Sequence, residues 1–121
     1  MIIRIDEYSD VPIYMQIRNQ IVMGISSGEL KGGEQLPTVR ALALEIGINT
    51  MTVSKTYQLF KQEGYIMTDR KKGARVRENI ARSGVISDSN RTELMRIVSE
   101  ARLSGVSKDE LKELIDEFYS E

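Results

Sequence analysis

The sequence predicts a mainly α-helical fold with one small β-hairpin. Three observations lead to this fold class. Five segments carry apolar residues at helical spacing, two of these segments are joined by a very short turn, and two short extended runs follow the third segment. With 121 residues, the chain is long enough for one domain with an appendage and for a modest core.

The first helix is expected to begin near Pro12 and to end before Gly28. Its signal is a row of isoleucines that recurs every four residues, at positions 13, 17, 21 and 25. Asp10 is the candidate N-cap, with Pro12 in the first turn. Residues 29–35 include two adjacent glycines, so they are expected to form the turn that follows.

A second helix is expected to begin at Pro37 and Thr38, with a buried face formed by Leu42, Ala43 and Ile46. Gly47 suits the left-handed position that ends a helix. Asn49 can cap the next helix only two positions later. Two helices joined by so tight a turn make a helix-turn-helix.

The third helix is expected over about residues 50–63 and ends at Gly64, and its core-facing side chains are Val53, Tyr57 and Phe60. Two short extended runs follow it, at residues 65–68 and 74–77. The segment between them, residues 69–73, is strongly basic. These runs therefore predict a hairpin whose tip carries positive charge.

The chain is expected to divide into two parts of different kind. The helix-turn-helix and the hairpin after it make a winged helix-turn-helix domain, residues 1–78, in which the hairpin is the wing. Residues 79–87 contain Ser and Gly and show no helical stripe. They are expected to form the connection at the start of the second part, a helical tail that spans residues 79–121.

The tail is expected to hold two amphipathic helices with narrow apolar stripes. The first is capped by Asn90 or a neighbour and ends at Gly105, and the second begins with a capping box of Ser107 and Glu110. Because these stripes cannot bury much between themselves, they need a partner surface. Either the first helix of the domain or the tail of a second copy can supply it, and the second alternative predicts a homodimer. The candidate dimerisation residues are Leu94, Ile97, Val98, Ala101, Leu111, Leu114, Ile115 and Phe118.

Charge is distributed unevenly along the chain. The whole sequence has 17 basic and 18 acidic residues and a net charge of −1. Residues 37–77, however, hold eight basic and three acidic residues, whereas residues 79–121 hold six basic and nine acidic residues. The basic middle of the chain is therefore suited to meet an anion, and the acidic tail is expected to face away from it.

Composition excludes several classes of function. The chain has no Cys and no His, so disulfides, thiolate or imidazole metal sites and imidazole catalysis are excluded. We find no glycine-rich phosphate loop and no nucleophile paired with a base, so an enzyme is not expected, and neither is a cofactor or a metal. The charged N-terminus and the lack of any long apolar run predict a cytoplasmic protein with no membrane partner.

The third helix and the hairpin together predict a surface that binds double-stranded DNA. A helix in the major groove needs small polar and basic side chains on its N-terminal half, and five cations within residues 70–77 suit phosphates. Arg40 is expected to contact DNA, since the alternative ion pair with Glu45 has poor helical spacing. Each group of residues also has an alternative without a DNA role. The polar residues at the start of the third helix can be ordinary capping and solvated residues, and the basic run of the hairpin can be a solvated charged surface. The candidate DNA contacts are Arg40, Asn49, Thr50, Met51, Thr52, Ser54, Lys55, Arg70, Lys71, Lys72, Gly73 and Arg75.

Residues 12–76 resemble the N-terminal domain of the GntR family of bacterial regulators. The matching motifs are PIYMQI at 12–17, GELKGG at 28–33, LPTVR at 36–40, NTMTVSK at 49–55 and EGYI at 63–66. The short helical tail is similar to that of the YtrA-like subfamily. The resemblance implies a dimer formed through the tail that binds an inverted repeat, typically as a repressor and often of a transporter operon. Two-fold symmetry would set the two recognition helices roughly 34 Å apart, which is one turn of DNA.

Carried over by position, the resemblance places DNA contacts at Arg40, along residues 49–55, and at Lys72 and Gly73 of the wing. The chain departs from the family at four positions: Glu is common in place of Val39, Arg in place of Thr50, Gly in place of Lys71, and an aromatic residue in place of Arg75. Thr50 predicts an operator that differs from familiar ones, while Lys71 and Arg75 add phosphate contacts and alter the wing turn.

The sequence leaves regulation by a small molecule open. The tail is too short for the effector domain that the family usually attaches. A small molecule would bind at the dimer seam or between tail and DNA-binding domain, or regulation would follow abundance alone. The alternative from another functional class is a winged-helix module that binds proteins without specific DNA binding.

Overall fold

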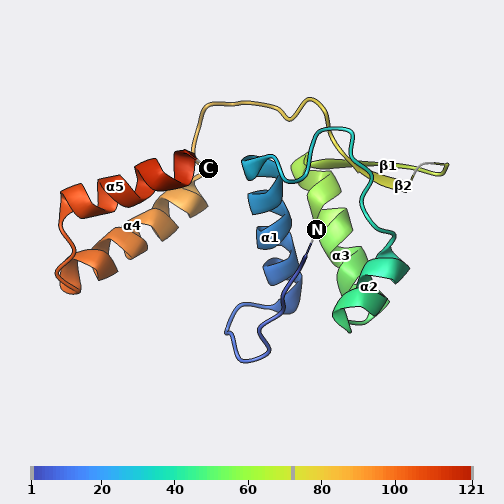
Figure 1. Cartoon of the computed structure of the whole chain (residues 1–121), viewed down its shortest axis with the longest axis horizontal. Helices are drawn as coiled ribbons and strands as arrows, with labels where there is room; N and C mark the ends of the chain where they lie inside the picture. Colours follow the sequence, from blue (N-terminus) through green and yellow to red (C-terminus); the bar gives the residue numbers. More distant parts are fainter. Residues whose placement is uncertain (1, 72, 121) are drawn as a thin grey trace. The chain divides into compact units, whose positions relative to one another are not determined.

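The computed structural model describes residues 2–71 and 73–120. The chain forms two compact units, Met1–Ala81 and Arg82–Glu121 (Figure 1). The described residues hold five helices and one antiparallel hairpin, so the expectation of a mainly α-helical winged helix-turn-helix with two further helices is confirmed. None of the described helices is long and apolar enough to cross a membrane.

Helix α1, Ile13–Ser27, begins close to the expected start near Pro12, but its N-cap differs from the prediction. Asp10 is not its N-cap; that position belongs to Pro12, whose ψ of 146° keeps it extended and which makes no side-chain capping bond. The reason is local, because the preceding residues turn back on themselves, with Val11 N donating to Ser9 Oγ at 3.1 Å. The helix ends as expected at Gly28, whose φ of +86° favours glycine.

The helix-turn-helix consists of α2, Val39–Ile46, and α3, Thr50–Glu63. Its turn depends on two residues predicted from sequence. Gly47 has φ +72° and ends α2, and Asn49 caps α3 by accepting a hydrogen bond from Thr52 N at 2.9 Å. Both predictions are confirmed.

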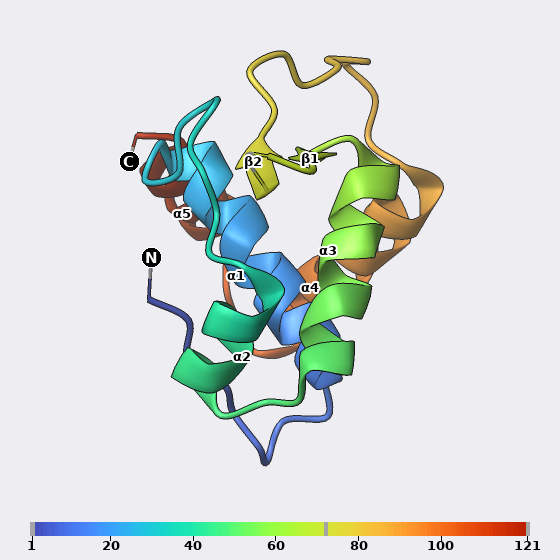
Figure 2. The ribbon, with the colours of Figure 1, turned by 90° about the vertical axis from the view of Figure 1, so that its right-hand side faces the viewer.

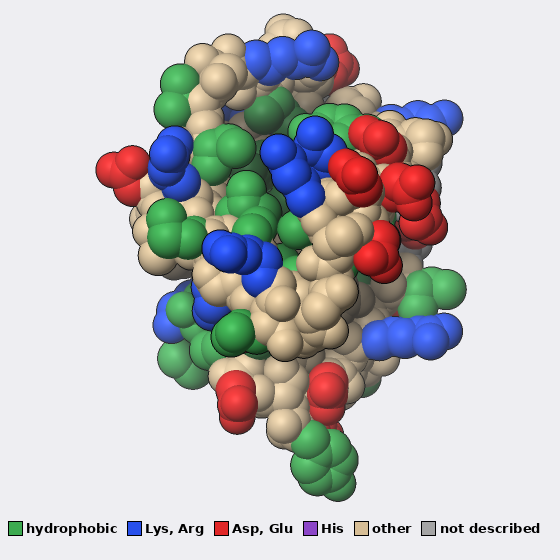
Figure 3. All heavy atoms as spheres, turned by 90° about the vertical axis from the view of Figure 1, so that its left-hand side faces the viewer, with side chains coloured by type: hydrophobic (Ala, Val, Ile, Leu, Met, Phe, Trp, Pro, Cys, Tyr) green, Lys and Arg blue, Asp and Glu red, His purple; other side chains and the backbone are tan. Residues whose placement is uncertain are grey.

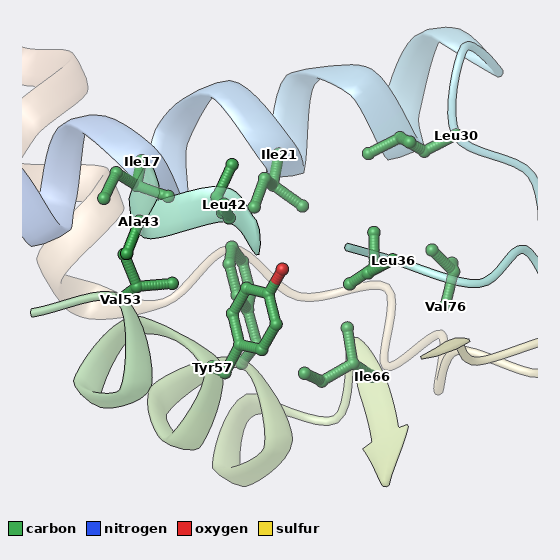
Figure 4. Packing of buried hydrophobic residues seen from close by; sticks show 11 residues of the cluster. Ile17, Ile21, Leu30, Leu36, Leu42, Ala43, Val53, Tyr57, Ile66 and Val76 are labelled. Carbon is green, nitrogen blue, oxygen red and sulfur yellow. The ribbon is translucent and has the colours of Figure 1, made fainter. Parts of the chain in front are cut away.

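The core lies where α1, α2, α3 and the hairpin meet. Figure 4 shows Ile17 and Ile21 of α1 on the side of that helix that faces α3 and Ile66. Phe60 is fully buried among them, and its ring meets Tyr65 edge-on with centroids 6.2 Å apart. Because each fully buried large apolar side chain contributes about 1.5 to 3 kcal/mol, this cluster dominates the stability of the unit.

The hairpin pairs β1, Ile66–Asp69, with β2, Gly73–Val76. Both strands are shifted by one residue from the predicted runs. Tyr65 is not in β1 because its N–H donates to Phe60 O at 3.0 Å and so closes the end of α3. The chain before α2 adds a further pairing that the sequence did not predict: Leu36 N donates to Ala74 O and Val76 N to Glu34 O, both at 2.9 Å.

An N-terminal arm, residues 2–6, lies against α1 and was not predicted either. Gln20 brackets the peptide groups of Arg4, accepting from its N–H at 2.9 Å and donating to its carbonyl at 2.6 Å. Gln16 does the same for Asp6, at 2.8 and 2.9 Å. Ile3 and Ile5 then pack against the core.

The second unit contains α4, Asp88–Leu103, and α5, Lys108–Tyr119. Ser87 caps α4 by accepting from Asn90 N at 3.1 Å, so the capping residue is the neighbour and Asn90 lies in the first turn. The capping box of Ser107 and Glu110 at the start of α5 is confirmed. No residue in 82–120 is buried, so the apolar stripes of both helices remain accessible.

Candidate nucleic-acid interface

The N-terminal half of α3 carries the polar side chains predicted from sequence. Thr50 and Met51 are exposed at its first turn, and Met51 retains 82% of its accessible surface. Asn49 and Thr52 differ from them, because the Asn49 carboxamide oxygen accepts from both the N–H and the hydroxyl of Thr52, at 2.9 and 3.0 Å. The capping alternative is thus correct for these two side chains, although the amide nitrogen of Asn49 is left for another partner.

Lys55 lies one turn further along α3 and is held over an aromatic ring. Its ammonium nitrogen is 4.3 Å from the centre of the Tyr14 ring of α1. A cation in this position interacts with the negative face of the ring, worth about 0.5 to 1 kcal/mol at an exposed site. The charge of Lys55 is therefore fixed at the edge where α1 meets α3.

Arg40 is exposed in the first turn of α2. Across residues 2–71 and 73–120 it forms no ion pair, so the alternative pairing with Glu45 is not found. A guanidinium without an acidic partner at the surface is available to a phosphate or to a base edge.

A groove of about 370 Å³ runs between α3 and the hairpin, which lie close together in Figure 2. One wall is formed by α3, which contributes Ser54, Gln58 and Lys61. The hairpin contributes the other wall through residues that include Thr68, Gly73 and Ala74. The sequence-based contact set included Ser54 and Gly73 but not Gln58 or Lys61. Their spacing of four and seven residues from Ser54 was the available signal, since it places all three on one helical face.

The tip of the hairpin is exposed and basic. Arg70 and Lys71 both extend into solvent, and the predicted contact Lys72 lies outside the described residues. The turn is organised by Asp69, whose carboxylate accepts from Lys71 N at 2.8 Å. Gly73 follows with φ +69°, a conformation that favours glycine.

Arg75 differs from the other cations of the wing because it is partly buried. It pairs with Met67 across the hairpin, and both line a hollow of about 320 Å³ that Arg77 and Glu78 also border. Within the described part of the chain its Nε is buried and has no hydrogen-bond partner. Successive strand residues point to opposite faces, so Arg75 lies on the other face of the hairpin from Ala74 and the groove.

Two contacts hold α3 against its neighbours. Arg18 of α1 donates through Nε to Glu63 at 2.9 Å, and this hydrogen bond, followed by the Coulomb attraction, raises the pKa of Arg18. Tyr57 donates its hydroxyl to Pro37 O at 2.7 Å and thereby ties α3 to the segment that enters α2. Burial raises the pKa of the Tyr57 phenol above its ordinary value. These two contacts hold α3 in place against α1 and against the segment before α2, and so they set the orientation of its exposed face.

The predicted dimerisation residues lie on α4 and α5 and fall into two groups. Val98, Ala101 and Leu111 are partly buried within the tail unit. The other five are exposed by more than 40%: Leu94, Ile97, Leu114, Ile115 and Phe118. The second unit therefore leaves five of the eight predicted dimerisation residues accessible to solvent.

Comparison with known proteins agrees with the resemblance noted in the sequence. The family model described as bacterial regulatory proteins, gntR family, matches residues 13–76. The HTH-type transcriptional repressor YtrA of Bacillus subtilis (strain 168) is 37% identical over 117 residues, which are 95% of this chain and 90% of that protein.

Two solved structures cover nearly the whole chain. YtrA from Sulfolobus acidocaldarius, a GntR-family transcription factor, is 38% identical with a TM-score of 0.61 over 98% of this chain and 97% of that one. A transcriptional antiterminator from Listeria monocytogenes EGD-e is 32% identical with a TM-score of 0.81 over 100% of this chain and 91% of that one. The predicted resemblance to the YtrA-like subfamily is confirmed, since both YtrA relatives match this chain over nearly its whole length, the helical tail included. The chain belongs to the GntR family of bacterial regulatory proteins and is a DNA-binding transcription regulator, not an enzyme.

Proposed function

We propose that this protein represses transcription by binding an inverted-repeat operator as a homodimer, with α3 in the major groove and the hairpin on the adjacent backbone. The observation that carries the proposal is that Ser54, Gln58 and Lys61 of α3 face the hairpin across one groove. The polar start of the same helix and the basic tip of the same hairpin are both exposed. Because the two chemistries meet on one unit, the same surface supplies base contacts and phosphate contacts.

Base contacts are assigned to the first two turns of α3. Thr50 and Ser54 offer hydroxyls that donate to or accept from base edges, and the exposed Met51 suits the methyl group of thymine. Asn49 contributes its amide nitrogen and Thr52 supports it from within the cap. An operator recognised by Thr50 differs from one recognised by arginine at this position.

Phosphate contacts are assigned to the cations that surround the groove. Where a strand of DNA passes from the helix to the hairpin, its backbone must cross between them, beside Lys61. Arg40 and Lys55 lie on the helical side. Arg70, Lys71 and Lys72 are the wing contacts, with Gly73 permitting close approach. Arg75 contributes charge from the opposite face of the wing.

The homodimer is assigned to the second unit, with residues 1–78 as the DNA-binding domain and residues 79–121 as the dimerisation tail. The support is the set of apolar side chains that α4 and α5 leave accessible, among them Leu114 and Phe118. Burying this surface against a second copy gives a two-fold assembly, and a two-fold assembly requires an inverted repeat with half-sites roughly 34 Å apart.

Repression is proposed because the B. subtilis relative is named a repressor. The family resemblance adds the genes of a transporter as the proposed target. The described residues do not identify a small-molecule effector, and the proposal does not include one.

The first experiment is an anisotropy titration against the upstream DNA of the gene and against a scrambled duplex, at about 50 and 200 mM salt. We expect preference for the native duplex and a steep loss of affinity with salt on both. The double variant Thr50→Ala, Ser54→Ala should lose the preference, by about 1 to 3 kcal/mol for each lost base contact. The matched control is Thr92→Ala with Ser26→Ala, which removes one threonine and one serine hydroxyl at exposed positions away from α3. Equal and negligible binding to both duplexes would favour a protein-interaction module instead.

A further inference from the structure

The tail unit contains an apolar groove between its two helices. The groove has a volume of about 720 Å³, and its apolar lining comes from Val98 and Ala101 of α4, Val106 of the connection, and Leu111 and Ile115 of α5. Figure 3 shows a hollow lined with hydrophobic side chains on this side of the molecule. A groove of this character is suited to receive an apolar ridge.

The charged residues around the groove all have the same sign. Arg102, Lys108 and Lys112 line it, and no carboxylate of the described tail does. This is unexpected for a segment with six basic and nine acidic residues. Two of the acidic residues lie elsewhere and pair with a cation, since Glu93 and Glu100 both form ion pairs with Arg96 on α4. The groove therefore suits a ridge that is apolar in its centre and acidic at its edge.

Helix α5 provides such a ridge along the edge of the same apolar stripe, beside the residues that line the groove. Leu114 and Phe118 are four residues apart and are 43% and 62% exposed. Glu110 and Glu117 flank this ridge on the Leu114 side, because they are four residues before and three residues after Leu114. Leu111 and Ile115 line the groove, whereas Leu114 and Phe118 do not.

We infer that the groove of one copy receives the Leu114–Phe118 ridge of α5 from a second copy, with Glu110 and Glu117 opposite Lys108, Lys112 and Arg102. This inference rests on the proposed homodimer and specifies its contact. Two-fold symmetry makes the insertion reciprocal, so each copy gives a ridge and takes one. Apolar burial supplies the affinity, whereas the charges select the partner and fix the direction of its helix.

Two charge variants test the inference without removing an apolar contact. Lys108→Glu with Lys112→Glu reverses the groove, and Glu110→Gln with Glu117→Lys changes the ridge. Glutamine at position 110 preserves the capping box, and Lys108→Glu places a glutamate in the first turn of α5, where it favours the helix. Lys112→Glu lies beyond the first turn and adds a like charge four residues before Asp116, so circular dichroism must show that helix content is retained before a weaker dimer is assigned to the groove.

Each variant has a control with the same change in net charge. Arg82→Glu with Arg91→Glu matches the groove variant at two exposed cations that do not line the groove. Asp109→Asn with Asp116→Lys matches the ridge variant on a different face of α5. Dimer dissociation constants are measured by analytical ultracentrifugation of the full chain, at about 0.15 M salt.

We expect the dimer dissociation constant of each test variant alone to be roughly tenfold or more above that of the native chain. The reason is that each substituted charge acts twice in a symmetric dimer. Both controls should remain dimers, and an equimolar mixture of the two test variants should recover the native dissociation constant as a heterodimer. A native dimer whose test variants associate as tightly as the controls would overturn the charged contact and leave the homodimer standing. A native chain that is monomeric would overturn both proposals.

Discussion

Removing the two described cations at the tip of the hairpin should reduce the salt dependence of DNA binding by a calculable amount. Arg70 and Lys71 are both exposed, and neither forms a side-chain ion pair within the described part of the chain. Each phosphate contact contributes about 0.9 to the slope of log K against log salt concentration. A dimer presents each residue twice, so Arg70→Ala with Lys71→Ala should lower the slope by about 3.6.

This change in slope is large enough to measure by anisotropy. Between about 50 and 200 mM salt, the native protein should lose roughly a hundredfold more affinity than the variant. The loss should be equal for the native and the scrambled duplex, because phosphate contacts do not depend on sequence. Arg82→Ala with Arg91→Ala removes two cations from the second unit and serves as the control. An unchanged slope in the tip variant, or an equal fall in the control, would refute the role of the wing.

Three further predictions concern the support of α3. Asn49→Ala should lower the free energy of unfolding by about 1 kcal/mol in urea titrations, whereas Asn49→Ser should retain stability; a DNA affinity that falls with Asn49→Ser would then reflect the lost amide. Tyr57→Phe removes the hydrogen bond to Pro37 O and should lower the free energy of unfolding by about 1 kcal/mol near neutral pH. Burial raises the pKa of Tyr57, so its neutral form stabilises the fold below the unfolded pKa, and stability should fall as pH rises above about 10. This fall should be smaller in Tyr57→Phe, and identical pH profiles for the two proteins would contradict the assignment.

The parts of the fold that follow from short-range signals could be predicted from the sequence. Gly47, Asn49 and Gly64 fix the helix ends through their own backbone and side chains, and their positions agree with the structure. The limits of the hairpin could not be predicted to the residue. Whether Tyr65 belongs to the strand or to the helix end depends on where its N–H finds an acceptor, and Phe60 O provides one.

Contacts between distant segments were beyond the sequence patterns. The pairing of Leu36 with Ala74 joins segments that carry no shared signal. The groove beside Lys61 exists only once the hairpin has folded next to α3, so charge and helical spacing alone did not select this residue. Arg75 is a further example. Its charge predicted an exposed contact, whereas its position in the strand makes it partly buried.

The two glutamines of α1 also determine which residues of the N-terminal arm are free to vary. Gln16 and Gln20 bind peptide groups of Asp6 and Arg4, and every residue type except proline offers the same N–H and carbonyl. Homologues can therefore exchange the side chains at positions 4 and 6 without losing the arm, provided that apolar residues remain at Ile3 and Ile5. Mutational tolerance should be broad at the even positions of the arm and narrow at the odd positions and at the two glutamines.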